Sequence, residues 1–207
     1  MKTTIMKKFI FILLILGTIF SCSSTKVTSS WKEPNKQLFI NDLNKVLVVA
    51  LFKTETSRRK AEDEMVNHLG GKGIVSYNYL DDKFNQYNED SIRDKIKIDG
   101  FDGAITMRLL DLDKEDVYSR NLISSYPQYY RSFSSYFYRN WGYYSNPEYY
   151  TETIKYTVET NVFSIKEDKI IWTGITESVN PDGVDKMMHE ISKSVYKVMV
   201  DEGFVKR

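Results

Sequence analysis

One run of the sequence, KVLVVALF at Lys45–Phe52, limits the possible folds more than any other. After its lysine every residue is apolar, whereas a strand with one face in water alternates apolar and polar side chains. A continuous apolar run of this length is typical of a strand that is buried on both faces of a parallel sheet. Such a strand needs a covering layer on each side, so the run favours an α/β fold.

The segments that follow this strand alternate in type. The run RRKAEDEMVNHLGG predicts a helix with Ala61, Met65 and Leu69 on one face, capped by Thr54–Ser57 and ended by Gly70-Gly71. GIVSYNY at 73–79 predicts a second strand. Next comes a short helix that begins at Ser91. It is followed by a third predicted strand, GAITMRLLDL at 103–112. This alternation predicts a βαβαβ unit with right-handed crossovers.

The period changes near the end of the chain. In TIKYTVETNVF, apolar residues alternate with polar ones such as Glu159 and Asn161, which predicts an antiparallel strand with one face in water. A turn at Lys166–Lys169 and the run IIWTGIT complete a hairpin, and a helix with Met188, Ile191 and Val195 on one face ends the chain. We therefore predict a mixed five-stranded sheet in the order 2-1-3-4-5, the first three strands parallel and the last two antiparallel, with helices on both faces.

The N-terminal segment has the pattern of a signal peptide. Lys2, Lys7 and Lys8 precede the uncharged apolar run Phe9–Phe20, whose 12 residues are fewer than the roughly 20 that a transmembrane helix needs. A small residue, Ser21, directly precedes Cys22, the one cysteine of the chain. This pattern resembles the lipobox of bacterial lipoproteins, in which the cysteine becomes the acylated N-terminus. The resemblance implies lipid attachment at Cys22 and contact with a membrane through N-terminal acyl chains.

These boundaries divide the chain into a signal peptide at 1–21, a lipid tether at 22–41 and a single α/β domain at 42–207. Within the polar tether, Trp31 is expected to pack against the domain. Removal of the signal peptide takes away three lysines and no acid, which leaves 26 basic and 28 acidic residues. This balance excludes the strongly basic character of nucleic-acid-binding domains.

An aromatic-rich insert at about 118–150 interrupts the domain, and ten of the 15 tyrosines lie between Tyr118 and Tyr150. Three interpretations stay open: a recognition surface for an envelope protein or a glycan, a cover for the sheet, and contact with the lipid interface. Disordered segments are usually poor in aromatic residues, so plain disorder is disfavoured. The candidate binding surface consists of Tyr129, Tyr130, Arg131, Tyr136, Tyr138, Arg139, Trp141, Tyr143 and Tyr144.

Several segments together resemble a known group of proteins. TKVTSSWKEPN, KVLVVALFK, GFDGAITMRLLDLD, the Tyr-rich insert and YTVETNVFSIKEDKIIWTGITES are similar to uncharacterised bacterial envelope lipoproteins. The resemblance implies an α/β core like the N-terminal domain of TolB that carries a Tyr-rich hairpin. It supplies no catalytic residues.

The residues show no pattern of reaction chemistry. His68 and His189 fall on different predicted helices without neighbours at metal-ligand spacing, and Asp111–Asp116 lacks the glycine and the closing glutamate of a calcium loop. No phosphate-binding loop or nucleophile elbow is present in the sequence. We therefore expect no enzyme, no cofactor and no metal site, with a hydrolytic enzyme as a distant alternative.

The combined expectation is a lipid-anchored protein of the bacterial cell envelope that acts as a binding or assembly module through its aromatic insert. The alternative is a purely structural lipoprotein whose insert covers the sheet. The residues after Cys22, SSTK, include no acid, which favours the periplasmic side of the outer membrane over the cell surface.

Overall fold

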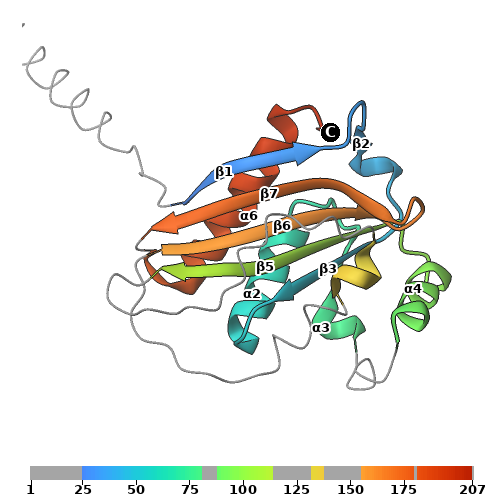
Figure 1. Ribbon diagram of the computed structural model, residues 1–207, viewed down its shortest axis with the longest axis horizontal. Coiled ribbons are helices and arrows are strands. Elements are labelled where there is room, and N and C mark those ends of the chain that lie inside the picture. Colours follow the sequence, from blue (N-terminus) through green and yellow to red (C-terminus); the bar gives the residue numbers. More distant parts are fainter. Residues whose placement is uncertain (1–24, 81–87, 114–131, 138–154, 180, 207) are drawn as a thin grey trace, which may run out of the picture.

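A single mixed sheet of six strands forms the centre of the computed structural model, which describes residues 25–80, 88–113, 132–137, 155–179 and 181–206 (Figure 1). Its strands are β1 (Thr25–Lys32), β3 (Val46–Leu51), β4 (Gly73–Val75), β5 (Gly103–Asp113), β6 (Lys155–Ser164) and β7 (Lys169–Val179). They lie in the order β1-β7-β6-β5-β3-β4. Strand β3 is parallel to β4 and β5, whereas β6 is antiparallel to β5 and β7. The predicted class, and the predicted order and directions of five strands, are confirmed.

Strand β3 is buried along its whole length, as its apolar run predicted. On one face Val46, Val48 and Ala50 belong to a core with the helices α2 (Glu55–Val66) and α6 (Gly183–Asp201). On the other face its alternate residues belong to a second core with α4 (Glu89–Ile98) and a short helix at 133–137. Helices therefore cover both faces, as predicted.

The long helices on the first face follow the predicted pattern. Met65 of α2 and Ile191 of α6 are fully buried, and the Thr54 hydroxyl caps α2 by accepting a hydrogen bond from the Ser57 amide at 3.2 Å. The helix α2 ends at Val66, before the predicted glycines. Gly70 and Gly71 instead form the following turn, where their φ angles of 56° and 81° suit glycine.

On the second face, the helix α4 begins earlier than predicted. Asn88, not Ser91, is its N-cap, because the Asn88 side chain accepts a hydrogen bond from the Ser91 amide at 2.8 Å. Ile92 and Ile96 form its buried face, as the spacing indicated.

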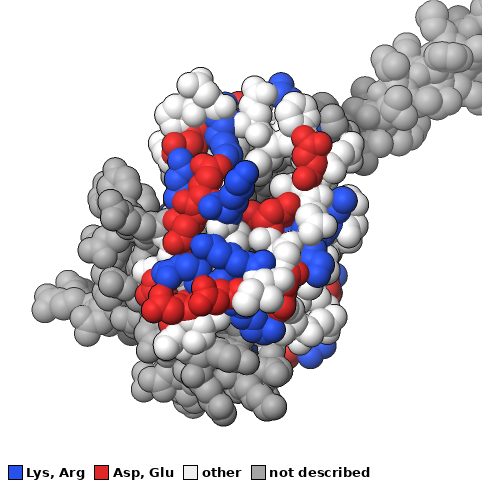
Figure 2. All heavy atoms as spheres, turned by 90° about the vertical axis from the view of Figure 1, so that its right-hand side faces the viewer, with Lys and Arg blue, Asp and Glu red and all other residues white. Residues whose placement is uncertain are grey.

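A small second sheet lies at the end of the main sheet where β3 and β5 begin. It pairs β2 (Leu38–Phe39) with β8 (Val205–Lys206) in parallel, and the short helix η1 (Ile40–Asp42) follows β2. Figure 2 shows this end of the molecule, where the described residues carry positive and negative charges interspersed. Two of the ion pairs here join Arg93 to Asp168 and Lys169 to Glu33. Neither sign of charge dominates this face.

The segment predicted as a tether contains the sixth strand. Within 22–41, Thr25–Lys32 form β1, which pairs antiparallel with β7. Its side chains are mostly exposed, and the sequence therefore looked like a polar linker, but its backbone completes the sheet edge. Trp31 lies in this strand, paired with Thr173 of β7, and 47% of its surface is exposed, so it belongs to the domain but is only partly covered by it. The ordered domain begins by Thr25.

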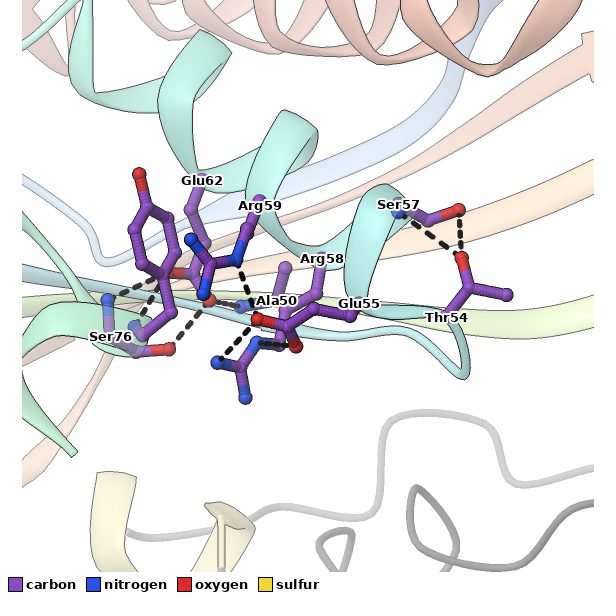
Figure 3. A network of polar contacts seen from close by, with 9 residues as sticks. Ala50, Thr54, Glu55, Ser57, Arg58, Arg59, Glu62 and Ser76 are labelled. Carbon is purple, nitrogen blue, oxygen red and sulfur yellow. Dashed lines mark hydrogen bonds and ion pairs between the residues drawn. The ribbon is translucent and has the colours of Figure 1, made fainter. Parts of the chain in front are cut away.

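The predicted second strand, 73–79, is cut short by a buried carboxylate. Strand β4 ends at Val75 and the helix α3 (Ser76–Tyr79) follows. Glu62 of α2 accepts hydrogen bonds from the amides of Ala50 (3.0 Å), Ser76 (2.6 Å) and Tyr77 (3.3 Å) and from the Ser76 hydroxyl (2.6 Å) (Figure 3). These bonds turn the chain into α3 and join it to α2 and to β3. Burial raises the pKa of Glu62, while the hydrogen bonds from Ala50, Ser76 and Tyr77 act in the opposite direction.

Strand β6 differs from its prediction in one respect. The alternation indicated one face in water, yet every residue from Val158 to Ser164 is buried. Glu159 and Asn161, on the face predicted to be wet, are only 4% and 2% exposed. The cover over this part of the sheet includes the helix at 133–137, which belongs to the aromatic insert.

The Glu62 network leads to a stability prediction. Glu62→Gln replaces one acceptor oxygen by an amide donor, so at least one buried N–H loses its partner, and we expect a loss of about 1–3 kcal/mol in the free energy of unfolding. Glu55→Gln is the matched control, because Glu55 lies on the same helix, is 52% exposed and forms ion pairs with Arg58 and Arg59. Ion pairs of an exposed carboxylate are worth about 0–1 kcal/mol. Denaturant unfolding of both variants measures the difference. Equal stabilities would contradict the structural role of Glu62.

Candidate functional site

Of the aromatic insert that carries the predicted binding surface, the structure describes the middle, residues 132–137. Of the nine residues of this surface only Tyr136 is described; Tyr129, Tyr130, Arg131, Tyr138, Arg139, Trp141, Tyr143 and Tyr144 lie outside the described residues, as does Cys22. Tyr136 has no exposed surface. Its assignment to an exposed recognition surface is therefore wrong, because its ring is buried against the sheet.

Tyr136 meets two charged side chains from neighbouring strands. Arg108 on β5 and Glu159 on β6 are directly opposed in the antiparallel register, so their side chains share one face of the sheet. The Tyr136 hydroxyl donates to Glu159 Oε2 at 2.5 Å, and Arg108 Nη2 donates to the same oxygen at 3.3 Å. Arg108 Nε lies 3.1 Å from the Tyr136 oxygen. We call these three residues the insert lock, because they join the helix at 133–137 to β5 and β6.

Aromatic packing surrounds the insert lock. The ring centroids of Tyr136 and Phe163 are 5.6 Å apart, and Phe133 lies 5.7 Å from both Phe137 and Phe163. Phe133 and Phe137 are 3% and 2% exposed. They share a core with Leu47, Val49 and Leu51 of β3. The middle of the insert is thus part of the second core.

The electrostatics of the insert lock keep both Tyr136 and Arg108 protonated. Burial, reinforced by the Glu159 carboxylate, raises the pKa of Tyr136 well above its usual value. Burial lowers the pKa of Arg108, but Tyr136 and Glu159 beside it more than offset this, and its pKa is raised overall. At neutral pH Tyr136 therefore stays a neutral hydrogen-bond donor and Arg108 stays a cation. The arrangement is suited to holding a segment in place.

Sequence reasoning missed Arg108 and Glu159. Both sit in strands predicted correctly, but Glu159 was assigned to a wet face. The spacing of Phe133, Tyr136 and Phe137 at i, i+3 and i+4 fits the buried face of a helical turn. The density of aromatic residues around it hid this signal, since such a dense stretch also fits a strand.

A cavity of about 70 Å³ lies on the opposite side of the sheet, in the first core. Apolar side chains from β2, β3, α2 and α6, among them Leu38, Val46, Met65 and Met199, form most of its wall. Lys36, His68 and Asp102 also line it. Its size and lining suit a small apolar group.

The two histidines have local partners. The His68 ring stacks on Tyr196 with centroids 4.6 Å apart, and burial lowers the pKa of His68. His189 Nδ1 lies 2.9 Å from Glu64 Oε2, which joins α6 to α2. Within the described ranges, no group of three His, Cys, Asp or Glu side chains is placed to hold a metal ion. None of the described helices is long and apolar enough to cross a membrane.

The insert lock leads to a second prediction. Tyr136→Phe keeps the ring and removes the hydroxyl, so we expect a loss of about 1.5–3 kcal/mol in stability, the range for hydrogen bonds to charged groups. Chymotrypsin should then cleave after Phe133 and Phe137 faster than in the parent. Tyr79→Phe is the control, because it removes a 2.6 Å hydrogen bond to Asp99 that lies outside the insert. Equal cleavage of both variants at these two sites would show that the lock does not hold the insert.

Comparisons with known proteins give distant structural likenesses. No known family model and no curated protein sequence matches the chain. It is similar to PelC from Paraburkholderia phytofirmans, solved as a dodecamer, with 9% identity over 88% of this chain and 99% of that chain and a TM-score of 0.45. It is also similar to lipoprotein GNA1162 from Neisseria meningitidis, with 8% identity over 76% of this chain and 98% of that chain and a TM-score of 0.38. At these scores the likenesses carry no inference about function.

Proposed function

We propose that this protein is a lipid-anchored component of the bacterial cell envelope and that its α/β domain is a binding or assembly module. In this proposal acyl chains on Cys22 hold it to the periplasmic side of the outer membrane. The aromatic residues on either side of the short helix at 133–137 recognise an envelope protein or a glycan. The proposal assigns no reaction to the protein.

The observation that carries the proposal is the insert lock. Connections longer than about 15 residues within compact domains are usually functional or disordered. Here the connection from β5 to β6 is attached to the sheet at its middle, through Tyr136, Glu159 and Arg108. A fixed point in the middle of a long connection limits the positions that the residues on either side can reach, which lowers the entropy cost of binding a partner. Tyr and Trp in those flanking stretches offer large amphipathic area for recognition.

A structural role for the insert has its own support. Phe133, Tyr136 and Phe137 complete the second core, so the insert covers the sheet at this point. This function does not compete with recognition, because the residues that carry it, Phe133, Tyr136 and Phe137, are distinct from those to which recognition is assigned in this proposal. The structural role predicts that substitutions in the middle of the insert lower stability, whereas the recognition role predicts that substitutions on either side of it reduce binding of the partner.

The anchor is tested in cells by Cys22→Ala. Because an acyl chain would be carried by this cysteine, we expect the variant to incorporate no fatty-acid analogue and to accumulate as an unprocessed precursor. Ser21→Ala is the matched control, since it keeps a small residue before Cys22 and should still be labelled. Label retained by the Cys22→Ala protein would contradict attachment at this position.

Recognition by the insert is tested by photo-crosslinking in cells. A photoreactive phenylalanine analogue in place of Tyr129 or Tyr143 is expected to give an adduct of discrete mass. The same analogue in place of Ile98 is the control, because Ile98 is 82% exposed on α4 and outside the insert. Adducts of the same mass from all three positions, or none from the insert, would contradict recognition by the insert.

A further inference from the structure

The two connections that matter for the proposed function leave the sheet at the same end. The register pairs Asp113, the last residue of β5, with Lys155, the first of β6, and pairs Lys155 with Val179, the last of β7. Ser178 of β7 pairs in turn with Thr25, the first residue of β1. Figure 1 shows these four strand ends together on the left of the sheet. The insert and the N-terminal segment therefore emerge side by side.

The distance from this sheet end to the proposed anchor is short. Only Ser23 and Ser24 separate Cys22 from β1. Three Cα-to-Cα steps reach about 11 Å at most, even when the chain is fully extended. A lipid on Cys22 must therefore lie close to the start of β1. A tether of 20 residues, as the sequence alone suggested, would have left the domain free to turn.

We propose that this end of the sheet, formed by Thr25, Lys26, Lys155, Val179 and Val184, rests against the phospholipid bilayer that carries the anchor. The inference depends on the proposed lipid attachment and adds an orientation to it. The opposite end, with the mixed charges of Figure 2, then faces away from the membrane. The last residue of β5, Asp113, and the first residue of β6, Lys155, between which the insert is connected, then lie near the bilayer surface.

The chemistry of this end is compatible with a headgroup layer. Val179 and Val184 are 43% and 38% exposed, which places apolar surface beside the strand ends. Glu177 lies 3.0 Å from Lys155 and 3.8 Å from Lys26, and Asp182 lies 3.6 Å from Lys186, so each of these three lysines has an acidic partner. Attraction to anionic lipid is therefore not needed. The short covalent connection from Cys22 to β1 brings this end of the sheet close to the bilayer, and the surface here carries no large charge that headgroups would repel.

The test measures lysine acylation on vesicles. The domain beginning at Cys22 is coupled through its cysteine to maleimide-bearing phosphatidylethanolamine in phosphatidylcholine vesicles, and a water-soluble acylating reagent is followed by mass spectrometry. Lys26 is 71% exposed and should react several-fold more slowly on vesicles than in solution, as should Lys186 near the start of α6. Lys197, 72% exposed and about 21 Å along α6 from Gly183, should react at an unchanged rate.

A linker variant provides the internal control. Twenty Gly and Ser residues inserted between Ser24 and Thr25 give a mean reach of about 25 Å, so the acylation rates of Lys26 and Lys186 should return to those in solution. Equal slowing of Lys26 and Lys197, or no slowing of either, would overturn the orientation. Slowing of Lys26 at high protein concentration without vesicles would show that a second copy covers this end, and would also overturn it. Because the coupling is chemical, these outcomes are independent of whether cells acylate Cys22.

Discussion

Complete burial of β3 is the constraint on which the rest of the fold depends. None of its residues can face water, so the centre of the sheet must be covered on both sides. The helices α2 and α6 cover one side and are long and regular. The other side has the short helix α4 and needs more apolar cover. The aromatic insert supplies it with Phe133, Tyr136 and Phe137.

This requirement explains why polar groups are buried beneath the insert. Arg108 and Glu159 are opposed on β5 and β6, and alone they would be an ion pair at a wet face. Beside the helix at 133–137 Glu159 is buried and Arg108 is partly buried, and both need hydrogen-bond partners, because unpaired buried charges cost several kcal/mol. The Tyr136 hydroxyl bonds to both groups. The charged residues of β5 and β6 therefore need the Tyr136 hydroxyl as a hydrogen-bond partner, and the insert is held in place by the same hydrogen bonds.

The predictable parts of this fold are those with strong periodic signals. The buried run of β3 and the helical spacing of Met65 and Ile191 fixed the order and direction of five strands and the placement of helices on both faces. The errors came from long-range contacts that no local pattern records. Strand β1 looked like a linker because its side chains are exposed, although its backbone pairs with β7. Glu159 and Tyr136 were both predicted to lie at the surface. Glu159 is buried by the helix at 133–137 and Tyr136 is buried against β6, and neither contact can be read from the local sequence.

The central claim is that the middle of the insert is an integral part of the domain. Amide hydrogen exchange of the intact domain tests it most directly, since the Tyr136 amide donates to the Ser132 carbonyl at 3.2 Å within the short helix. The account predicts that peptides spanning 132–137 exchange slowly, with protection that approaches that of β6, and lose it together with β6 as denaturant is added. Exchange of 132–137 as fast as an unstructured peptide, while β6 stays protected, would contradict the account.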